Sequence, residues 1–163
     1  MARRRLNGIA PPGQLRSGAV SVMDLVAVIE QELLTPLREL AESLNRQFPD
    51  LTATVFSGAV GSLTEYQGYH IGVDCLFANV SANQPDNVAL SIDLQHLTTN
   101  PTIDAGVSWG HPSGHAEAEF SNEPLAVSES VLSDLYADIP RLGRALTEAA
   151  ERGRPSDGDE TQA

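Results

Sequence analysis

Hydrophobic and polar residues alternate with a period of two through the middle of the chain, from about residue 51 to residue 120. A strand with one buried face has this period, because successive side chains point to opposite sides of a sheet. Segments rich in Gly, Pro, Asn and Ser interrupt the alternation and indicate turns. The pattern predicts five half-buried strands, over residues 51–60, 66–78, 88–97, 102–109 and 115–120.

Two segments with the helical period flank these strands. Apolar residues recur at steps of three and four over 22–47 and over 128–152, which predicts two amphipathic helices. Pro36 and Pro140 lie inside them, and an interior proline removes one backbone hydrogen bond and bends a helix. We therefore expect two kinked helices, with two shorter helices as the alternative for the first.

The predicted order α-β-β-β-β-β-α indicates an α+β fold. A meander sheet with one apolar face needs a cover, and two amphipathic helices supply one. We predict a two-layer sandwich, with an antiparallel sheet and both kinked helices on one of its faces. A single domain would span residues 21–152, between a disordered basic arm over 1–20 and a disordered acidic tail over 153–163. Met23 is a second candidate initiator, and translation from it would remove the arm.

Strand parity divides the side chains of the predicted sheet into two sets. The inward set is apolar and includes Cys75 and Trp109. The outward set is polar and would form the face that the helices leave open. It comprises His70, Asp74, Ser91, Asp93, Gln95, Asp104, Ser108, Glu117 and Glu119.

Charge constrains the partners of this open face. The formal net charge is −12, and the chain contains no lysine. Residues 1–20 carry +4 and residues 21–150 carry −14, so the acidity is concentrated in the predicted domain. Nucleic-acid binders need clustered Lys and Arg, which argues against this class. An acidic domain attracts basic partners, although the same charge also serves solubility alone.

Cysteine content and hydropathy indicate the cellular compartment that we expect for the protein. The single cysteine, Cys75, excludes an internal disulfide and a cysteine-based zinc site, and it suits a reducing cytoplasm. No apolar run reaches about 18 residues, so we expect no transmembrane helix and no membrane partner. Pro11, Pro12 and Arg16 interrupt any signal-peptide core, which leaves a cytoplasmic location as the expectation.

One loop carries most of the candidate chemistry, because two histidines flank its Pro-Ser-Gly turn. The candidates for a catalytic or ligand-binding site are Trp109, His111, His115, Asp93 and His96. Asp93 or Asp104 would act as the base, and the histidines as proton carriers or ligands. The loop lacks the H-E-x-x-H and G-x-S-x-G patterns, and the chain has no phosphate-binding glycine motif. We predict neither a metal nor a cofactor, and an enzyme is the less favoured class.

The favoured function is an acidic protein-binding module that engages a basic protein through the open face and adjacent loops. Its partner-binding residues would be His70, Asp74, Asp93, Gln95, Asp104, Glu117 and Glu119. In size, charge and α+β form alone the chain resembles bacterial immunity proteins, and a toxin-neutralising or adaptor role is what this resemblance implies. The alternatives are a small enzyme or ligand-binding domain at the histidine loop, and a homodimer formed through sheet faces or edges.

Overall fold

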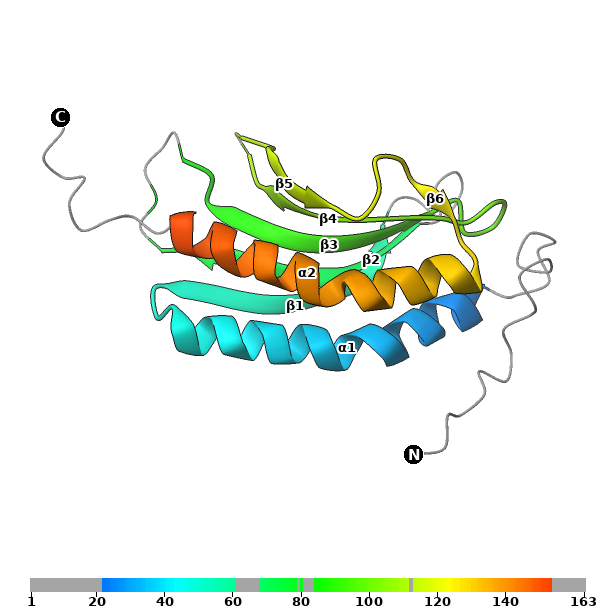
Figure 1. The fold of residues 1–163 in the computed structure, drawn as a ribbon, viewed down its shortest axis with the longest axis horizontal. Coiled ribbons are helices and arrows are strands. Elements are labelled where there is room, and N and C mark those ends of the chain that lie inside the picture. The colour runs from blue at the N-terminus through cyan, green and yellow to red at the C-terminus, as the bar shows by residue number, and fades with distance from the viewer. Residues whose placement is uncertain (1–21, 61–67, 79, 81–83, 112, 154–163) are drawn as a thin grey trace, which may run out of the picture.

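The computed structural model describes residues 22–60, 68–78, 80, 84–111 and 113–153. The predicted arm over 1–20, the predicted turn over 61–65 and the predicted tail beyond Gly153 lie outside these residues. The described chain forms two helices and six strands, in which the helices flank the strands in sequence (Figure 1). The predicted α+β class is therefore confirmed.

The elements follow the predicted order, with one short strand added. They are α1 (Val22–Gln47), β1 (Leu51–Val60), β2 (Gly68–Phe77), β3 (Asn87–Gln95), β4 (Thr102–Trp109), β5 (Ala116–Glu119), β6 (Leu125–Ala126) and α2 (Glu129–Gly153). The sequence pattern did not predict β6, because two residues are too few for an alternation to be recognised.

The sheet is an antiparallel meander in the order β1-β2-β3-β4-β5. β5 pairs with β4 only over Gly106–Ser108, and β6 pairs with β4 at Thr102 and Ile103. β6 therefore occupies the part of the β4 edge that the short β5 does not reach. This arrangement reduces the length of unpaired backbone at that edge.

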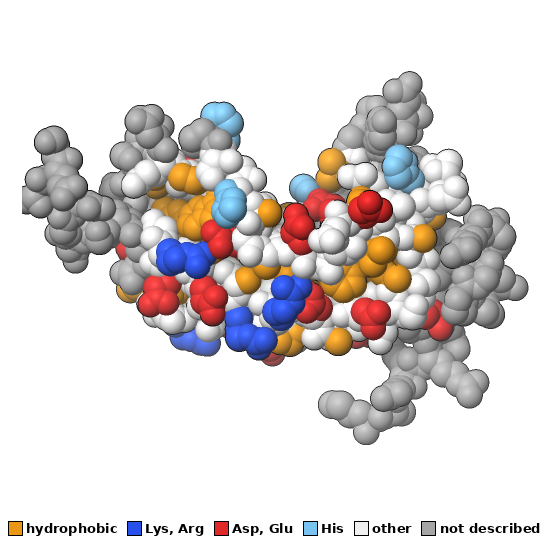
Figure 2. Space-filling view, turned by 45° about the horizontal axis from the view of Figure 1, so that its top comes forward, with side chains coloured by type: hydrophobic (Ala, Val, Ile, Leu, Met, Phe, Trp, Pro, Cys, Tyr) orange, Lys and Arg blue, Asp and Glu red, His pale blue; other side chains and the backbone are white. Residues whose placement is uncertain are grey.

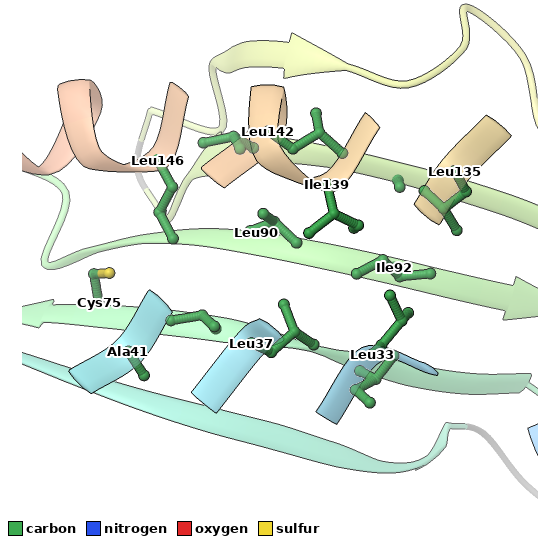
Figure 3. Close-up of a cluster of buried hydrophobic side chains, with 14 of the residues drawn as sticks. Leu33, Leu37, Ala41, Cys75, Leu90, Ile92, Leu135, Ile139, Leu142 and Leu146 are labelled. Carbon is green, nitrogen blue, oxygen red and sulfur yellow. The ribbon is translucent and has the colours of Figure 1, made fainter. Parts of the chain in front are cut away.

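Both helices cover one face of the sheet, as predicted, and the core lies between the two layers (Figure 1). Figure 3 shows Ile139 of α2 next to Leu90 and Ile92 of β3, whereas Leu37 of α1 lies over β2. Leu37, Leu90 and Ile92 are fully buried. Among the described residues no charged side chain is buried, so the core is apolar throughout. Burial of this apolar surface is the main force that holds the layers together.

The helices are continuous through their prolines. Pro36 lies inside α1 and Pro140 inside α2, so the alternative of two shorter helices in place of α1 is wrong. The hydroxyl of Ser128 accepts a hydrogen bond from the backbone N–H of Val131 at 3.2 Å, which caps the start of α2. No described helix combines the length and the apolar character needed to cross a membrane.

Asn45 of α1 protects the edge strand β1. Its side-chain oxygen accepts a hydrogen bond from the Ala53 N–H at 2.8 Å, and its amide nitrogen donates to the Ala53 carbonyl at 2.9 Å. Both backbone groups of Ala53 that point away from the sheet are thereby satisfied. Since edge pairing needs free backbone groups, this contact opposes the addition of another strand at Ala53.

Candidate partner-binding face

The sheet surface opposite the helices is not covered by any described element, and we call it the open face. Paired residues in neighbouring strands share a face, so the strand register identifies its side chains. They include Phe56, His70, Gly72, Asp74, Ser91, Asp93, Gln95, Asp104, Gly106 and Glu119. The register thus places all but one of the predicted partner-binding residues on this face, the exception being Glu117.

Three of the predicted residues form one line across the sheet, which we call the acidic row. His70 of β2 is paired with Asp93 of β3, and Asp93 is paired with Asp104 of β4. All three side chains are half-buried. The hydroxyl of Ser91 donates a hydrogen bond to Asp93 at 2.8 Å, and this contact orients the carboxylate.

The Asp93–Asp104 pair places two carboxylates directly opposite one another on adjacent strands. Like charges at directly opposite positions destabilise a sheet. Asp104 also accepts a hydrogen bond from the Ala105 N–H at 2.9 Å, which fixes its carboxylate close to the backbone. A positive group placed between the two carboxylates would relieve their repulsion. The strand register therefore places two carboxylates at adjacent positions of the open face, to which a cationic group can bind.

The row beside the acidic row has small side chains and low relief. Gly72 of β2, Ser91 of β3 and Gly106 of β4 are paired in register, and Glu119 of β5 continues the row. Phe56 of β1 lies over Gly72, and its ring meets the His70 ring edge-on with centroids 5.0 Å apart. The centre of the open face is therefore flat, with one aromatic side chain at its border.

Arginine is confined to the helices in the part of the chain that the structure describes. These residues are Arg38 and Arg46 in α1, and Arg141, Arg144 and Arg152 in α2. Figure 2 shows the arginine side chains over the helical layer with acidic side chains beside them, and further acidic and histidine side chains toward the sheet edge above. None of the described strands contains a basic residue other than His70. Arg141 of α2 reaches the end of β5, where it donates a hydrogen bond to the Glu119 carbonyl at 2.9 Å.

Glu117 does not lie on the open face, contrary to the prediction from alternation. It accepts a hydrogen bond from the indole N–H of Trp109 at 2.6 Å and pairs with Arg152 of α2 at 2.6 Å. The reason is a register shift between Val107 and Ser108, where β5 contributes one extra residue. Such a bulge changes the face on which a side chain lies. Glu117 therefore ties the end of α2 to the sheet.

This contact predicts an acid-sensitive contribution to stability. The Trp109 hydrogen bond, followed by the charge and hydrogen bond of Arg152, holds the pKa of Glu117 below its usual range. A lowered folded-state pKa stabilises the protein above the unfolded pKa, and the stabilisation is lost as the pH falls through the folded pKa. Glu117→Gln should lower the free energy of unfolding at neutral pH by about 1 kcal/mol or less, because the contact is partly exposed.

The measurement is chemical unfolding followed by Trp109 fluorescence at several pH values. The difference between wild type and Glu117→Gln should disappear once the pH falls well below about 4.3, the ordinary glutamate value. Glu119→Gln is the matched control, because Glu119 lies two residues away on the open face. An equal, pH-dependent loss in both variants would contradict the assigned role of Glu117.

The residues of the alternative catalytic site do not come together. Trp109 is paired with Val88 at one end of β3, whereas Asp93 lies five residues further along that strand. This separation is roughly 17 Å at about 3.3 Å per residue. His96 follows the far end of β3 in a left-handed conformation with φ 55°. His111 and His115 therefore share neither a base nor a ligand with Asp93 or His96.

The histidine loop is closed by backbone hydrogen bonds. The Trp109 N–H donates to the His115 carbonyl at 2.9 Å, and the Gly114 N–H donates to the Gly110 carbonyl at 3.1 Å. Both histidine side chains are exposed. Among the described residues no group of three or more His, Cys, Asp or Glu side chains could hold a metal ion. The loop is best described as a turn that joins two strands.

Cys75 is a core residue, in agreement with its predicted inward position. It is completely buried, and burial raises the pKa of its thiol to about 12. A thiol with such a pKa is protonated at neutral pH and is a poor nucleophile. Cysteine chemistry therefore has no place in the candidate site.

The described residues line two hollows, one on each layer of the sandwich. One of about 510 Å³ lies between the helices, where apolar Pro36, Leu40 and Ile139 contribute to its lining. The other, of about 250 Å³, lies at the end of the open face next to Asp93. Its lining includes Val60 and Gly68, which the sequence did not single out. A glycine and a valine at the ends of two predicted strands do not by themselves indicate a hollow, because both residues are common at strand ends.

Comparison of the chain with protein-family models, with curated proteins and with solved structures gives no match. The open face itself is therefore the basis on which a function can be inferred.

Proposed function

We propose that the protein is a binding module whose open face engages a basic protein. The observation that supports this proposal most is that the described arginines are confined to the helices, whereas acidic side chains lie on both layers. Asp93, Asp104 and Glu119 lie on the described open face, and the described arginines all lie on the helices. A basic surface would meet Asp93 and Asp104 on strands that contain no arginine, whereas Arg141 of α2 donates a hydrogen bond to the Glu119 carbonyl at 2.9 Å.

The shape of the open face suits a protein surface better than a small molecule. Small-molecule sites are concave and usually enclose about 300–1,000 Å³, whereas the row through Gly72, Ser91 and Gly106 presents backbone and small side chains beside the Phe56 ring. Electrostatic complementarity over such a surface accelerates association and selects against acidic partners. The repulsion between Asp93 and Asp104 adds to this selectivity, because a bound cation removes it.

The test compares two variants with the same change in charge on different layers. The open-face variant is Asp93→Asn/Asp104→Asn/Glu119→Gln. The helix variant is Glu42→Gln/Asp134→Asn/Glu151→Gln, which changes three exposed helical side chains. Each is used with wild type for affinity capture from the native host at low and high salt. We expect a basic protein to be retained by wild type and the helix variant, with affinity for the open-face variant at least about tenfold lower.

Retention should also fall as the salt concentration rises, because salt screens exposed charges. Equal retention by the open-face variant and the helix variant would contradict the proposal, since net charge rather than the open face would then decide binding. Failure of wild type to retain any basic protein at low salt would contradict it as well.

A further inference from the structure

The hollow at the end of the open face is built around a glycine, and we call it the Gly68 notch. Val60, Gly68, Asp93, Gln95 and His96 contribute to its lining. Gly68 is paired with Val60 of the edge strand β1. Since Gly68 has no side chain, the backbone of β2 forms the floor, and the side chains of the neighbouring strands form the walls.

The walls of the notch differ in chemistry. Val60 is 44% exposed, which makes it one of two large hydrophobic side chains that the described chain leaves open to solvent. Asp93 supplies a carboxylate that Ser91 already orients at 2.8 Å, and Gln95 supplies an amide whose oxygen can accept a hydrogen bond. An apolar wall beside two oxygen acceptors fits a side chain with an aliphatic stem and a cationic head.

Size further restricts the occupant. The volume of about 250 Å³ falls below the usual range for drug-sized ligands, which begins at about 300 Å³. A single long side chain is of suitable length, because its stem can lie along Val60 while its head reaches Asp93. The notch also borders the acidic row, so one ligand cation would lie next to the repelling Asp93–Asp104 pair.

We propose that the Gly68 notch binds an arginine side chain of the basic partner, an inference that rests on the proposed function. Arginine fits better than lysine for two reasons. Its planar guanidinium can donate to a carboxylate in a bidentate manner while a further N–H reaches the Gln95 oxygen. It is also more weakly hydrated than an ammonium group, and its flat head can lie on the glycine floor.

The experiment is a titration of the ¹⁵N-labelled protein followed by ¹H–¹⁵N correlation spectra. The probe is N-acetylarginine amide, a single guanidinium cation with neutral ends. We expect saturable shifts of the Val60, Gly68 and Gln95 amides at millimolar probe. N-acetylcitrulline amide, which keeps the shape and lacks the charge, should bind at least about tenfold more weakly. Nα-acetyllysine amide, which keeps its ε-ammonium charge, should also bind more weakly than the arginine probe.

Two isosteric variants separate the notch from the rest of the face. Asp93→Asn should weaken binding of the arginine probe at least about tenfold, because it removes the carboxylate in the notch. Asp104→Asn neutralises the neighbouring carboxylate outside the notch and should change binding by no more than about threefold through long-range charge. The unfolding midpoint from Trp109 fluorescence establishes that both variants are folded.

The outcomes distinguish this inference from the proposed function. Shifts that spread to Asp104 and Glu119, with equal losses in both variants, would overturn the notch and support the open face as a diffuse cation binder. Equal affinity for the arginine and lysine probes would overturn the choice of arginine. If the probe leaves the spectrum unchanged while the open-face triple variant still loses its basic partner, the notch alone is wrong. If the probe leaves the spectrum unchanged and the open-face triple variant still retains the basic partner, both proposals fail.

Discussion

Gly72→Ala should lower the free energy of unfolding by about 3 kcal/mol or more. This loss lies at or above the upper end of the usual range of costs for overpacking a well-packed structure. A β-carbon at this position would fall well inside van der Waals contact of the Leu90 carbonyl oxygen and 2.7 Å from Cζ of Phe56. The phenylalanine ring could turn aside. The Leu90 carbonyl belongs to the backbone of β3, so one added methyl group would force β2 and β3 apart.

Gly58→Ala provides a control on the neighbouring strand. Gly58 is paired with His70 and lies on the same face as Gly72, yet a β-carbon there would meet nothing within 4 Å. Because glycine in a strand costs about 0.5–1 kcal/mol relative to alanine, Gly58→Ala should be neutral or stabilising. Urea unfolding followed by Trp109 fluorescence gives both free energies. Similar values for the two variants would show that the close approach of β2 and β3 does not limit stability.

The position of Gly72 connects stability with the shape of the open face. The absence of a side chain lets the Phe56 ring approach the backbone of β2, and the ring in turn meets His70 of the acidic row. A larger residue at position 72 would displace the ring and roughen the flat row that borders the acidic row. The same glycine therefore allows tight strand packing and determines the shape of the open face at this point.

Alternation along the chain was sufficient to predict which side of the sheet most residues occupy. Leu90 and Ile92 are buried, and Ser91 and Asp93 lie on the open face, because the period of two holds throughout β3. The long amphipathic helices were predictable for the same reason, since their apolar stripes span many turns. Regular segments determine side-chain direction locally, so no knowledge of the partner strand is needed.

Glu117 shows where this reasoning fails. Its position in sequence continues the alternation, but the bulge in β5 turns it toward Trp109 and Arg152. A bulge depends on how β5 aligns with β4, and alternation within one strand contains no information about that alignment. The neighbouring Glu119 lies beyond the irregularity and keeps the predicted face.

The residues of the alternative catalytic site lie apart for a related reason. His111 and Asp93 carry suitable chemistry, and the sequence leaves open whether the sheet brings them together. The pairing of Asp93 with Asp104, and of Val88 with Trp109, places the two groups at opposite ends of β3. The same pairing creates the Asp93–Asp104 contact, which became the centre of the acidic row. Strand register therefore separates the residues of one hypothesis and brings together the carboxylates on which the other relies.

Leu135→Ala should lower the free energy of unfolding by about 2–5 kcal/mol, the usual cost of removing a buried leucine side chain. Leu135 of α2 is completely buried and belongs to the cluster that joins both helices to the sheet (Figure 3). Truncation removes apolar surface and leaves a cavity that the surrounding β-sheet is too rigid to close fully. The loss should appear as a lower urea midpoint with an unchanged slope.

Leu76→Ala is the matched control, because it makes the same chemical change on the other side of the sheet. Leu76 is 49% exposed, so its truncation should cost no more than about 0.5 kcal/mol, as expected for the surface. A small effect at Leu135 would place α2 outside the cooperative unit, and the open face would then lack the rigid backing that a flat binding surface requires. A large effect at Leu135 alone supports the two-layer arrangement in which the helices hold the sheet and leave its acidic side free for a partner.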